Sequence, residues 1–208
     1  MRRGRFVTME GLDGAGKTTQ LDVAADALKA RGLPLRVTRE PGGTPLGEAL
    51  RGLLLDPAAR YAPETETLLM FAARREHIDK VIAPALAEGT WVLCDRFTDA
   101  SFAYQGGGSG VEWPKLETLE HWVHADLHPD LTIYFDVSPE IGRSRASAIK
   151  TPDRFEQERA EFHARVRAAY LERAREHSNR IRVVDAGATV DEVSAAVRAI
   201  LSGFCEAA

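Results

Sequence analysis

A glycine-rich motif lies directly after a short apolar stretch near the N-terminus. It reads Gly-Leu-Asp-Gly-Ala-Gly-Lys-Thr at residues 11–18, and residues 5–9 before it have the composition of a strand. Glycine lets successive backbone N–H groups turn inward around a polyphosphate, and a helix that begins near Lys17 directs its positive dipole end at the same anion. A strand, this loop and a helix in that order predict a fold that holds a nucleoside triphosphate.

Two side chains of the motif have separate predicted roles. Lys17 can reach the β- and γ-phosphates as a compact charge, and the hydroxyl of Thr18 can ligate the Mg²⁺ that accompanies the nucleotide. The whole motif is expected to surround the phosphates, and its residues are Gly11, Leu12, Asp13, Gly14, Ala15, Gly16, Lys17 and Thr18.

Composition limits the number of domains and the kinds of partner. A chain of 208 residues, 44% hydrophobic, can bury one sizeable core, so we expect a single domain over residues 1–208. The formal charge of −4 gives no long-range attraction for nucleic acid. No apolar run approaches the roughly 20 residues that cross a bilayer. The two cysteines have no metal-binding or redox spacing. We therefore expect a cytoplasmic protein without nucleic-acid or membrane partners.

Apolar, β-rich stretches alternate with helical patterns along the chain. This alternation is typical of a parallel sheet with right-handed helical crossovers, and it predicts a three-layer α/β fold. The expected strands cover residues 6–9, 35–38, 91–94, 131–135 and 181–184.

Helix boundaries are marked by capping residues and prolines. Thr44-Pro45 predicts the start of one helix, and Pro63 opens a long helix that Pro84 should kink or divide. Thr189 and Glu192 have capping-box spacing at the start of the last helix, which we expect to end at Gly203.

Two segments differ from ordinary connections. Residues 104–110 contain four glycines, which favours either a flexible linker or a loop that shapes a substrate pocket. Residues 143–154 carry four basic side chains and a proline, which indicates either a mobile lid over phosphates or a solvated helix face.

Charged residues follow two of the expected strands. Asp95 and Arg96 come directly after the third strand, and Arg39 follows the second. Ligands of open α/β sheets bind at the carboxyl ends of strands, so Asp95 can hold Mg²⁺ and both arginines can hold a second phosphate. A simple ion pair at the strand end is the alternative. Two arginines beside a triphosphate site predict an anionic acceptor, as in a nucleotide kinase.

An aromatic residue and an arginine share a face of the long helix. Phe71 and Arg74 are three residues apart, so the ring can stack on a base while the guanidinium donates to a base carbonyl. A core position for Phe71 is equally compatible with this spacing.

These motifs together resemble those of bacterial thymidylate kinases. The similarity rests on residues 11–19, 38–44, 69–74, 95–97 and 103–108, which occur in the order found in that family. It implies transfer of phosphate from ATP to dTMP with Mg²⁺, a P-loop fold with a five-stranded parallel sheet, and a homodimer.

The resemblance also implies roles for individual residues. Position 15 is Ala rather than Arg, which is similar to the type in which the lid supplies the catalytic arginine. The implied catalytic residues are Lys17, Arg96, Arg145 and Lys150, with Arg154 behind them. The implied contacts to dTMP are Asp13 to the 3′-hydroxyl, Arg39 and Arg96 to the phosphate, Phe71 and Arg74 to thymine, Tyr104 near the 2′ position and Gln105 by the base.

Two other classes of nucleotide-binding protein remain as alternatives. A deoxynucleoside kinase needs a base for its neutral acceptor hydroxyl, and Glu40 could serve. A nucleotide switch reads guanine with Asn-Lys-x-Asp, but the only asparagine is Asn179, which precedes Arg180.

Overall fold

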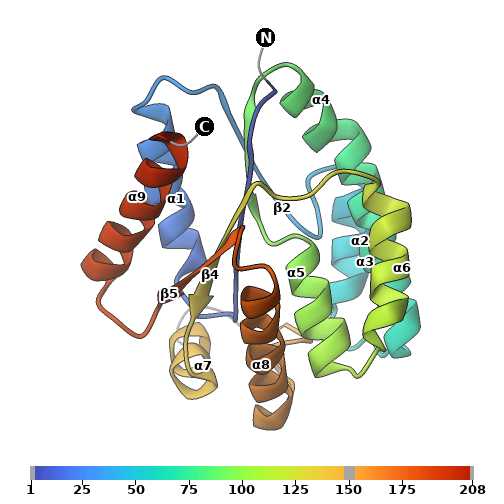
Figure 1. Cartoon of the computed structure of the whole chain (residues 1–208). Helices are drawn as coiled ribbons and strands as arrows, with labels where there is room; N and C mark the ends of the chain where they lie inside the picture. The colour runs from blue at the N-terminus through green and yellow to red at the C-terminus, as the bar shows by residue number, and fades with distance from the viewer. Residues whose placement is uncertain (1–2, 148–152, 207–208) are drawn as a thin grey trace.

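Parallel strands form the central sheet of the computed structural model, which describes residues 3–147 and 153–206 (Figure 1). The strand order is β2-β3-β1-β4-β5. The strands are β1 (Phe6–Gly11), β2 (Leu35–Arg39), β3 (Trp91–Asp95), β4 (Leu131–Asp136) and β5 (Ile181–Asp185). This confirms the predicted five-stranded parallel sheet, with strand ends within two residues of the expected positions.

Burial along the strands follows their place in the sheet. Every residue of central β1 is buried, and β3 and β4 on either side of it are buried except at their last residue. The edge strands are more exposed, because β2 has no buried residue and β5 is buried only at Ile181 and Val184. In register, Met9 pairs with Asp95 and Asp95 pairs with Arg39. The carboxyl ends of β1, β2 and β3 are therefore level with one another.

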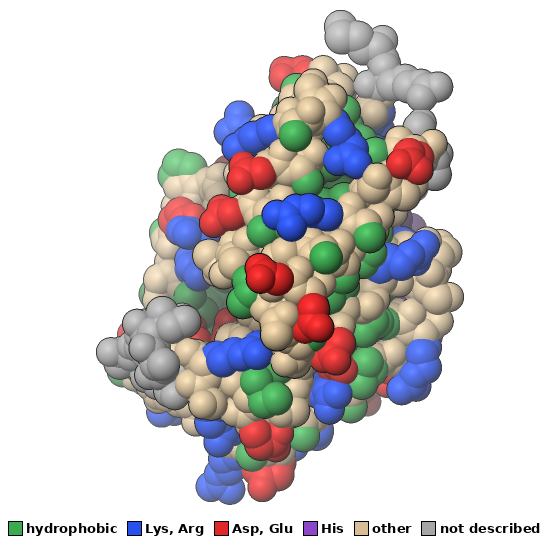
Figure 2. Space-filling view, turned by 90° about the vertical axis from the view of Figure 1, so that its left-hand side faces the viewer, with side chains coloured by type: hydrophobic (Ala, Val, Ile, Leu, Met, Phe, Trp, Pro, Cys, Tyr) green, Lys and Arg blue, Asp and Glu red, His purple; other side chains and the backbone are tan. Residues whose placement is uncertain are grey.

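Helices cover both faces of the sheet and complete three layers (Figure 1). On one face α1 (Lys17–Lys29) packs against α9 (Val190–Glu206). Figure 2 shows acidic and basic side chains interspersed over this side of the molecule. The remaining helical segments are α2 (Pro45–Leu55), α3 (Pro63–His77), η1 (Ile78–Ile82), α4 (Ala83–Ala87), α5 (Thr98–Ser101), η2 (Phe102–Gly108), α6 (Trp113–His124), α7 (Pro139–Ser147) and α8 (Ala160–Glu176).

The predicted helix signals are confirmed at most boundaries. The Thr44 hydroxyl accepts the Gly47 N–H at 2.9 Å at the start of α2, and Glu192 accepts the Thr189 N–H at 2.9 Å at the start of α9. The long helix is divided before Pro84 by the π-helical η1. The end predicted at Gly203 is wrong, because α9 continues to Glu206 while Phe204 and Cys205 pack against the core.

The glycine-rich segment at 104–110 is largely helical rather than a loop. Residues up to Gly108 belong to η2, a π-helix that packs against α8. An added Cβ at Gly107 would lie 2.6 Å from the Ala169 side chain and 2.9 Å from the Arg165 carbonyl oxygen. The glycines therefore permit close contact between η2 and α8. From composition alone, the segment was predicted to be a flexible linker or a loop.

Only part of the predicted lid is described. Arg143 and Arg145 lie on α7, while Lys150 falls outside the described residues. Within residues 3–147 and 153–206, no helix has both the length and the apolar character needed to span a membrane.

Candidate active site

The phosphate-binding loop connects β1 to α1 as predicted. Gly14 and Gly16 adopt the left-handed conformation, with φ of 77° and 83°, which favours glycine at both positions. The Lys17 ammonium is buried and donates to the carbonyl oxygens of Gly11 and Leu12 at 3.1 and 3.0 Å. Burial lowers the pKa of Lys17 below its ordinary value. The loop thus encloses a cation that can turn from carbonyl oxygens to phosphate oxygens.

Arg96 joins the end of β3 to this loop. Its backbone has φ 69°, an uncommon conformation for a residue with a side chain. Its guanidinium donates to the Gly11 carbonyl at 2.7 Å and to Asp13 Oδ1 at 2.9 Å. The Cys94 thiol donates to the Arg96 carbonyl at 3.0 Å. These contacts hold Arg96 beside the phosphate loop, where the sequence predicted it.

Glu10 is the last residue before the glycine motif, and its side chain holds the turn that follows β3. Its carboxylate accepts the Phe97 N–H at 2.7 Å and the Tyr170 hydroxyl at 2.8 Å. Burial, with a smaller contribution from the charge of Asp99, raises the pKa of Glu10 to about 8. Sequence reasoning did not single out Glu10, although a glutamate inside an apolar strand was a signal.

The residues predicted to hold Mg²⁺ suit a hard cation. Asp95 Oδ1 is buried and has no hydrogen-bond partner among the described residues. Thr18 is exposed in the first turn of α1. Burial lowers the pKa of Lys17, and the charge of Asp95 partly opposes that lowering, so the carboxylate acts on the phosphate loop. A buried carboxylate oxygen without a donor is a fitting ligand for Mg²⁺ or its water.

A pocket opens beside the loop, between the carboxyl ends of the strands and the helices after them. Its lining includes Asp13 and Arg96, which contact each other at the phosphate loop, and Arg74, Met70 and Gln105 from α3 and η2. The remaining lining residues are Glu40, Pro41, Arg51, Leu55, Phe97, Ala100, Ser101, Tyr104, Asp153 and Phe155. The pocket combines a cation beside the phosphate loop with polar side chains suited to a planar polar group.

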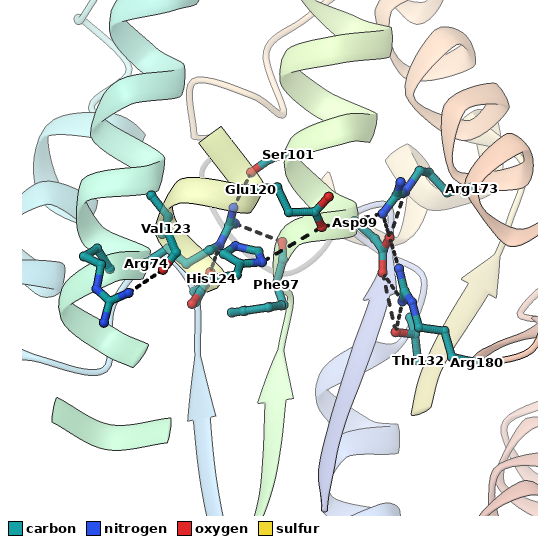
Figure 3. A network of polar contacts seen from close by, with 12 residues as sticks. Arg74, Phe97, Asp99, Ser101, Glu120, Val123, His124, Thr132, Arg173 and Arg180 are labelled. Atoms are coloured by element: carbon teal, nitrogen blue, oxygen red, sulfur yellow. Dashed lines mark hydrogen bonds and ion pairs between the residues drawn. The ribbon is translucent and has the colours of Figure 1, made fainter. Parts of the chain in front are cut away.

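Arg74 is held rigidly at the wall of this pocket. Its Nε donates to Glu40 Oε2 at 2.7 Å, and its two Nη atoms donate to the Ser101 hydroxyl and the Phe97 carbonyl, each at 3.0 Å (Figure 3). His77 Nδ1 donates to the other Glu40 oxygen at 2.9 Å. A guanidinium has five N–H donors, so two remain for a ligand. Because Glu40 is engaged on both oxygens, the arrangement disfavours it as a general base.

Two predicted contacts lie elsewhere in the structure. Arg39 does not line the pocket and donates to Glu48 at 3.0 Å, with 55% of its side chain exposed. Arg51 of α2 lines the pocket instead. Phe71 is buried in the core under the Arg74 guanidinium, whose carbon lies 4.8 Å from the ring centre. Met70, one residue earlier, lines the pocket in its place.

Tyr104 and Gln105, which the family resemblance assigned to contacts with dTMP, both line the pocket. The Arg96 guanidinium carbon lies 5.0 Å from the centre of the Tyr104 ring. Gln105 Nε2 donates to Glu66 Oε1 at 2.8 Å. Both side chains come from η2, so the π-helix presents two consecutive residues to one cavity.

The lid arginines have different surroundings. Arg145 donates to the Ala186 carbonyl at 2.8 Å, whereas Arg143 lines a second hollow together with Leu12 and Asp13 of the phosphate loop. An added Cβ at Gly14 would lie 2.0 Å from the Gly142 carbonyl oxygen, so α7 touches the loop directly. Arg154 is buried and paired with Glu66. In this arrangement Arg143 is the α7 arginine next to the loop.

Comparison with known proteins gives one consistent result. A family model described as thymidylate kinase matches residues 9–197. The thymidylate kinase of Nitrosomonas europaea is 59% identical over 98% of this chain and 95% of its own. That of Nitrosospira multiformis is 60% identical over 94% and 95%. The crystal structure of thymidylate kinase from Ehrlichia chaffeensis has a TM-score of 0.79 and 34% identity, covering 96% of this chain and 99% of that one.

Proposed function

The chain belongs to the thymidylate kinase family, and we propose that the pocket and the phosphate loop hold the two substrates of its reaction. As a member of that family it is an ATP-dependent nucleoside monophosphate kinase with a P-loop fold. It transfers the γ-phosphoryl group of ATP to dTMP and yields ADP and dTDP.

We assign dTMP to the pocket between Arg96 and Arg74. The observation that carries this assignment is the pocket's lining, which combines Arg96 and Asp13 at the phosphate loop with Arg74 and Gln105 from α3 and η2. The phosphate of dTMP lies by Arg96 and Arg51, with Arg39 farther out. Arg74 donates to a thymine carbonyl, Asp13 contacts the 3′-hydroxyl and Tyr104 lies under the sugar. Met70 covers the base in the role that the sequence gave to Phe71.

ATP occupies the loop at residues 11–18, and its transferring phosphoryl group faces the pocket. Lys17 holds the β- and γ-phosphates, and Thr18 and Asp95 hold Mg²⁺, which neutralises phosphate charge when bound. The lid spans residues 143–154 of a single domain. Arg143 supports the transferring group from α7, together with Arg145 and Lys150. Its place beside Leu12 and Asp13 supports this role.

Positioning and charge neutralisation account for the chemistry. A phosphate monoester is largely deprotonated at neutral pH, so its oxygen attacks the γ-phosphorus without a general base, and the bond to the β-phosphate oxygen breaks. Arg96 and Lys17 then face the charge on either side of the transferred group. The salt bridge of Glu40 to Arg74 supports dTMP over thymidine as acceptor.

We also propose a homodimer in the cytoplasm. Large apolar side chains are exposed on α2, α3 and α6, including Leu68 at 55% and Trp122 at 78%. These helices pack side by side at one flank of the sheet (Figure 1). An exposed apolar face of this kind supports association with a second copy. Free thiols at Cys94 and Cys205 support a reducing compartment.

An acceptor assay tests the assignment. ADP release from ATP and Mg²⁺ is measured with dTMP, thymidine, dUMP, dCMP, AMP and no acceptor in parallel. Turnover mainly with dTMP is the expected result. Preference for thymidine would require Glu40 to act as a base, and hydrolysis without acceptor would contradict the kinase assignment.

A further inference from the structure

The orientation of the Gln105 side-chain amide is fixed from behind the pocket. Its Nε2 donates to Glu66 Oε1 at 2.8 Å, and both side chains are almost fully buried. An ionised carboxylate only accepts hydrogen bonds, so the amide must present its NH₂ group to Glu66. Gln105 Oε1 is therefore the atom left for the cavity. Among the described residues, none donates to this oxygen.

Glu66 is itself held by a buried cation. Its second oxygen, Oε2, pairs with the Arg154 guanidinium, whose Nε donates to the Leu54 carbonyl at 3.0 Å. The same guanidinium lies 4.2 Å from the centre of the Phe155 ring, which also lines the pocket. The Arg154 guanidinium therefore stabilises the charged Glu66 carboxylate that accepts from Gln105. The sequence had instead suggested that Arg154 reaches toward the phosphates.

We propose that Glu66 is a positioning residue that sets base selectivity by holding the Gln105 carbonyl oxygen toward the base. This inference rests on the proposed binding of dTMP in this pocket. Thymine carries a hydrogen on N3, which Gln105 Oε1 can accept. Cytosine has a lone pair at N3, so two acceptors would face each other without a proton. A buried polar group without its partner is costly, and such sites reject the wrong analogue strongly.

The variant Glu66→Gln tests the orientation with little change in shape. Arg154 requires an acceptor, so the introduced amide turns its oxygen to the guanidinium and its NH₂ to the Gln105 side chain. Gln105 must then accept that hydrogen bond and turn its own NH₂ to the pocket, where it can donate to N3 of cytosine. We expect the ratio of kcat/KM for dTMP to that for dCMP to fall at least about tenfold. KM for ATP should be unchanged, and Arg74 still favours a carbonyl at the 4-position.

A second substrate pair isolates the N3 hydrogen. Binding of dTMP and of 3-methyl-dTMP, which lacks that hydrogen, is measured by calorimetry without ATP. The wild-type enzyme should bind dTMP more tightly than 3-methyl-dTMP. In Glu66→Gln the difference between the two affinities should be smaller. Glu64→Gln is the matched control, because Glu64 lies on the same first turn of α3 with 62% of its side chain exposed. It should leave both ratios unchanged.

Several outcomes would overturn the inference. A folded Glu66→Gln enzyme could keep the wild-type ratio of kcat/KM for dTMP to that for dCMP, or lose kcat/KM equally for both nucleotides. Either result would show that Glu66 has a purely structural role. Should that variant fail to fold, nuclear Overhauser contacts in the wild-type complex decide. Contacts of the Gln105 NH₂ protons with Glu66 support the inference, and contacts with the bound base refute it.

Gln105→Leu separates this inference from the assignment of the pocket. Gln105→Leu could raise KM for dTMP and abolish the preference for dTMP over dCMP while Glu66→Gln changes neither quantity. That result would refute only the role of Glu66. Unchanged KM for dTMP in Gln105→Leu would contradict the placement of the base itself.

Discussion

At the scale of single residues, we expect the buried ammonium group of Lys17 to have the most direct effect on turnover. Lys17 is the lysine that the phosphate loop encloses, and its ammonium already occupies the centre of that loop through Gly11 and Leu12. Lys17→Ala should lower kcat at least about 100-fold, because a preorganised cation facing the transferring group is lost. The measurement is steady-state ADP release with dTMP. Activity within a few-fold of the wild-type value would contradict the loop assignment.

Replacing either of two arginines near the proposed position of the acceptor phosphate should have a different effect. Arg51 lines the pocket, whereas the Arg39 guanidinium is bound to Glu48 outside it. Arg51→Ala should raise KM for dTMP about tenfold, in line with loss of a charge-assisted hydrogen bond. Arg39→Ala should have a clearly smaller effect on the same constant, and KM for ATP serves as the internal control. A larger effect at Arg39 would support the arrangement that the sequence predicted.

His124 is a buried imidazole whose two ring nitrogens lack hydrogen-bond partners among the described residues. It packs against Phe97 with ring centres 4.8 Å apart, and its nearest carboxylate, Glu120, is 3.9 Å away (Figure 3). Burial lowers the pKa of His124 to about 2. Below the ordinary pKa near 6.5 the unfolded chain binds a proton that the folded protein excludes, so stability falls as pH falls.

Replacing this imidazole should therefore stabilise the fold. His124→Leu removes two unpaired polar atoms and should add about 1 kcal/mol to the free energy of unfolding at pH 7.5. The gain should grow by up to about 2 kcal/mol at pH 5.0. Urea unfolding at the two pH values measures both quantities. A gain that is equal at both values would show that His124 titrates normally in the folded state.

Side-chain contacts also explain which residues of the candidate site the sequence could not place correctly. The sequence could place Lys17, Asp95 and Arg96 near one another because motif spacing and a strand end fix their backbone positions. Tyr104 and Gln105 were indicated by the family resemblance, and the roles of all five residues stay predictions. Met70 and Phe71 are adjacent on one helix, and only the rotation of α3 against η2 and α6 decides which of them faces the pocket. Arg39 and Arg51 likewise depend on a tertiary contact, the pairing of Arg39 with Glu48. Such choices are made by packing, which a single sequence does not display.

At the scale of elements, η2 shows how a glycine-rich segment can be rigid. Gly107 faces the Ala169 side chain and the Arg165 backbone of α8, and Arg165 donates to the carbonyls of Gly107 and Gly108. Gly107→Ala should lower the free energy of unfolding by about 1 to 3 kcal/mol, because the added methyl group would meet the Ala169 Cβ and the Arg165 carbonyl oxygen, neither of which is the end of a flexible side chain. Gly52→Ala on α2 is the control, since an added Cβ there meets no atom within 4 Å. It should be neutral or stabilising by up to about 1 kcal/mol.

Thermal unfolding of these two variants gives a direct comparison. Equal behaviour of Gly107→Ala and Gly52→Ala would show that η2 is loosely packed, as a loop would be. The elements that were predicted well are those with local signals, such as the Thr44 cap and the Thr189 capping box. The π-helical form of η2 has no local signal, because it depends on α8, which lies about sixty residues farther along the chain.

At the scale of the whole molecule, the two flanks of the sheet present different surfaces. The side of α1 and α9 mixes charges of both signs (Figure 2). The helices α3 and α6 on the other side expose Leu68 and Trp122. An exposed tryptophan carries a large share of the association energy in many interfaces. The asymmetry between the flanks therefore predicts which one meets a second copy of the chain.

Charge substitutions on the two flanks test this prediction. Trp122→Glu should shift the protein from dimer to monomer. The substitution replaces apolar area that the dimer would bury with a charge that has no partner in the interface. Val190→Glu on α9 is the matched control, with 62% of its side chain exposed, and it should leave the assembly unchanged. Light scattering after size-exclusion chromatography gives the mass of each variant. A Trp122→Glu protein that stays dimeric, or a wild-type chain that is already monomeric, would show that this apolar face does not mediate self-association.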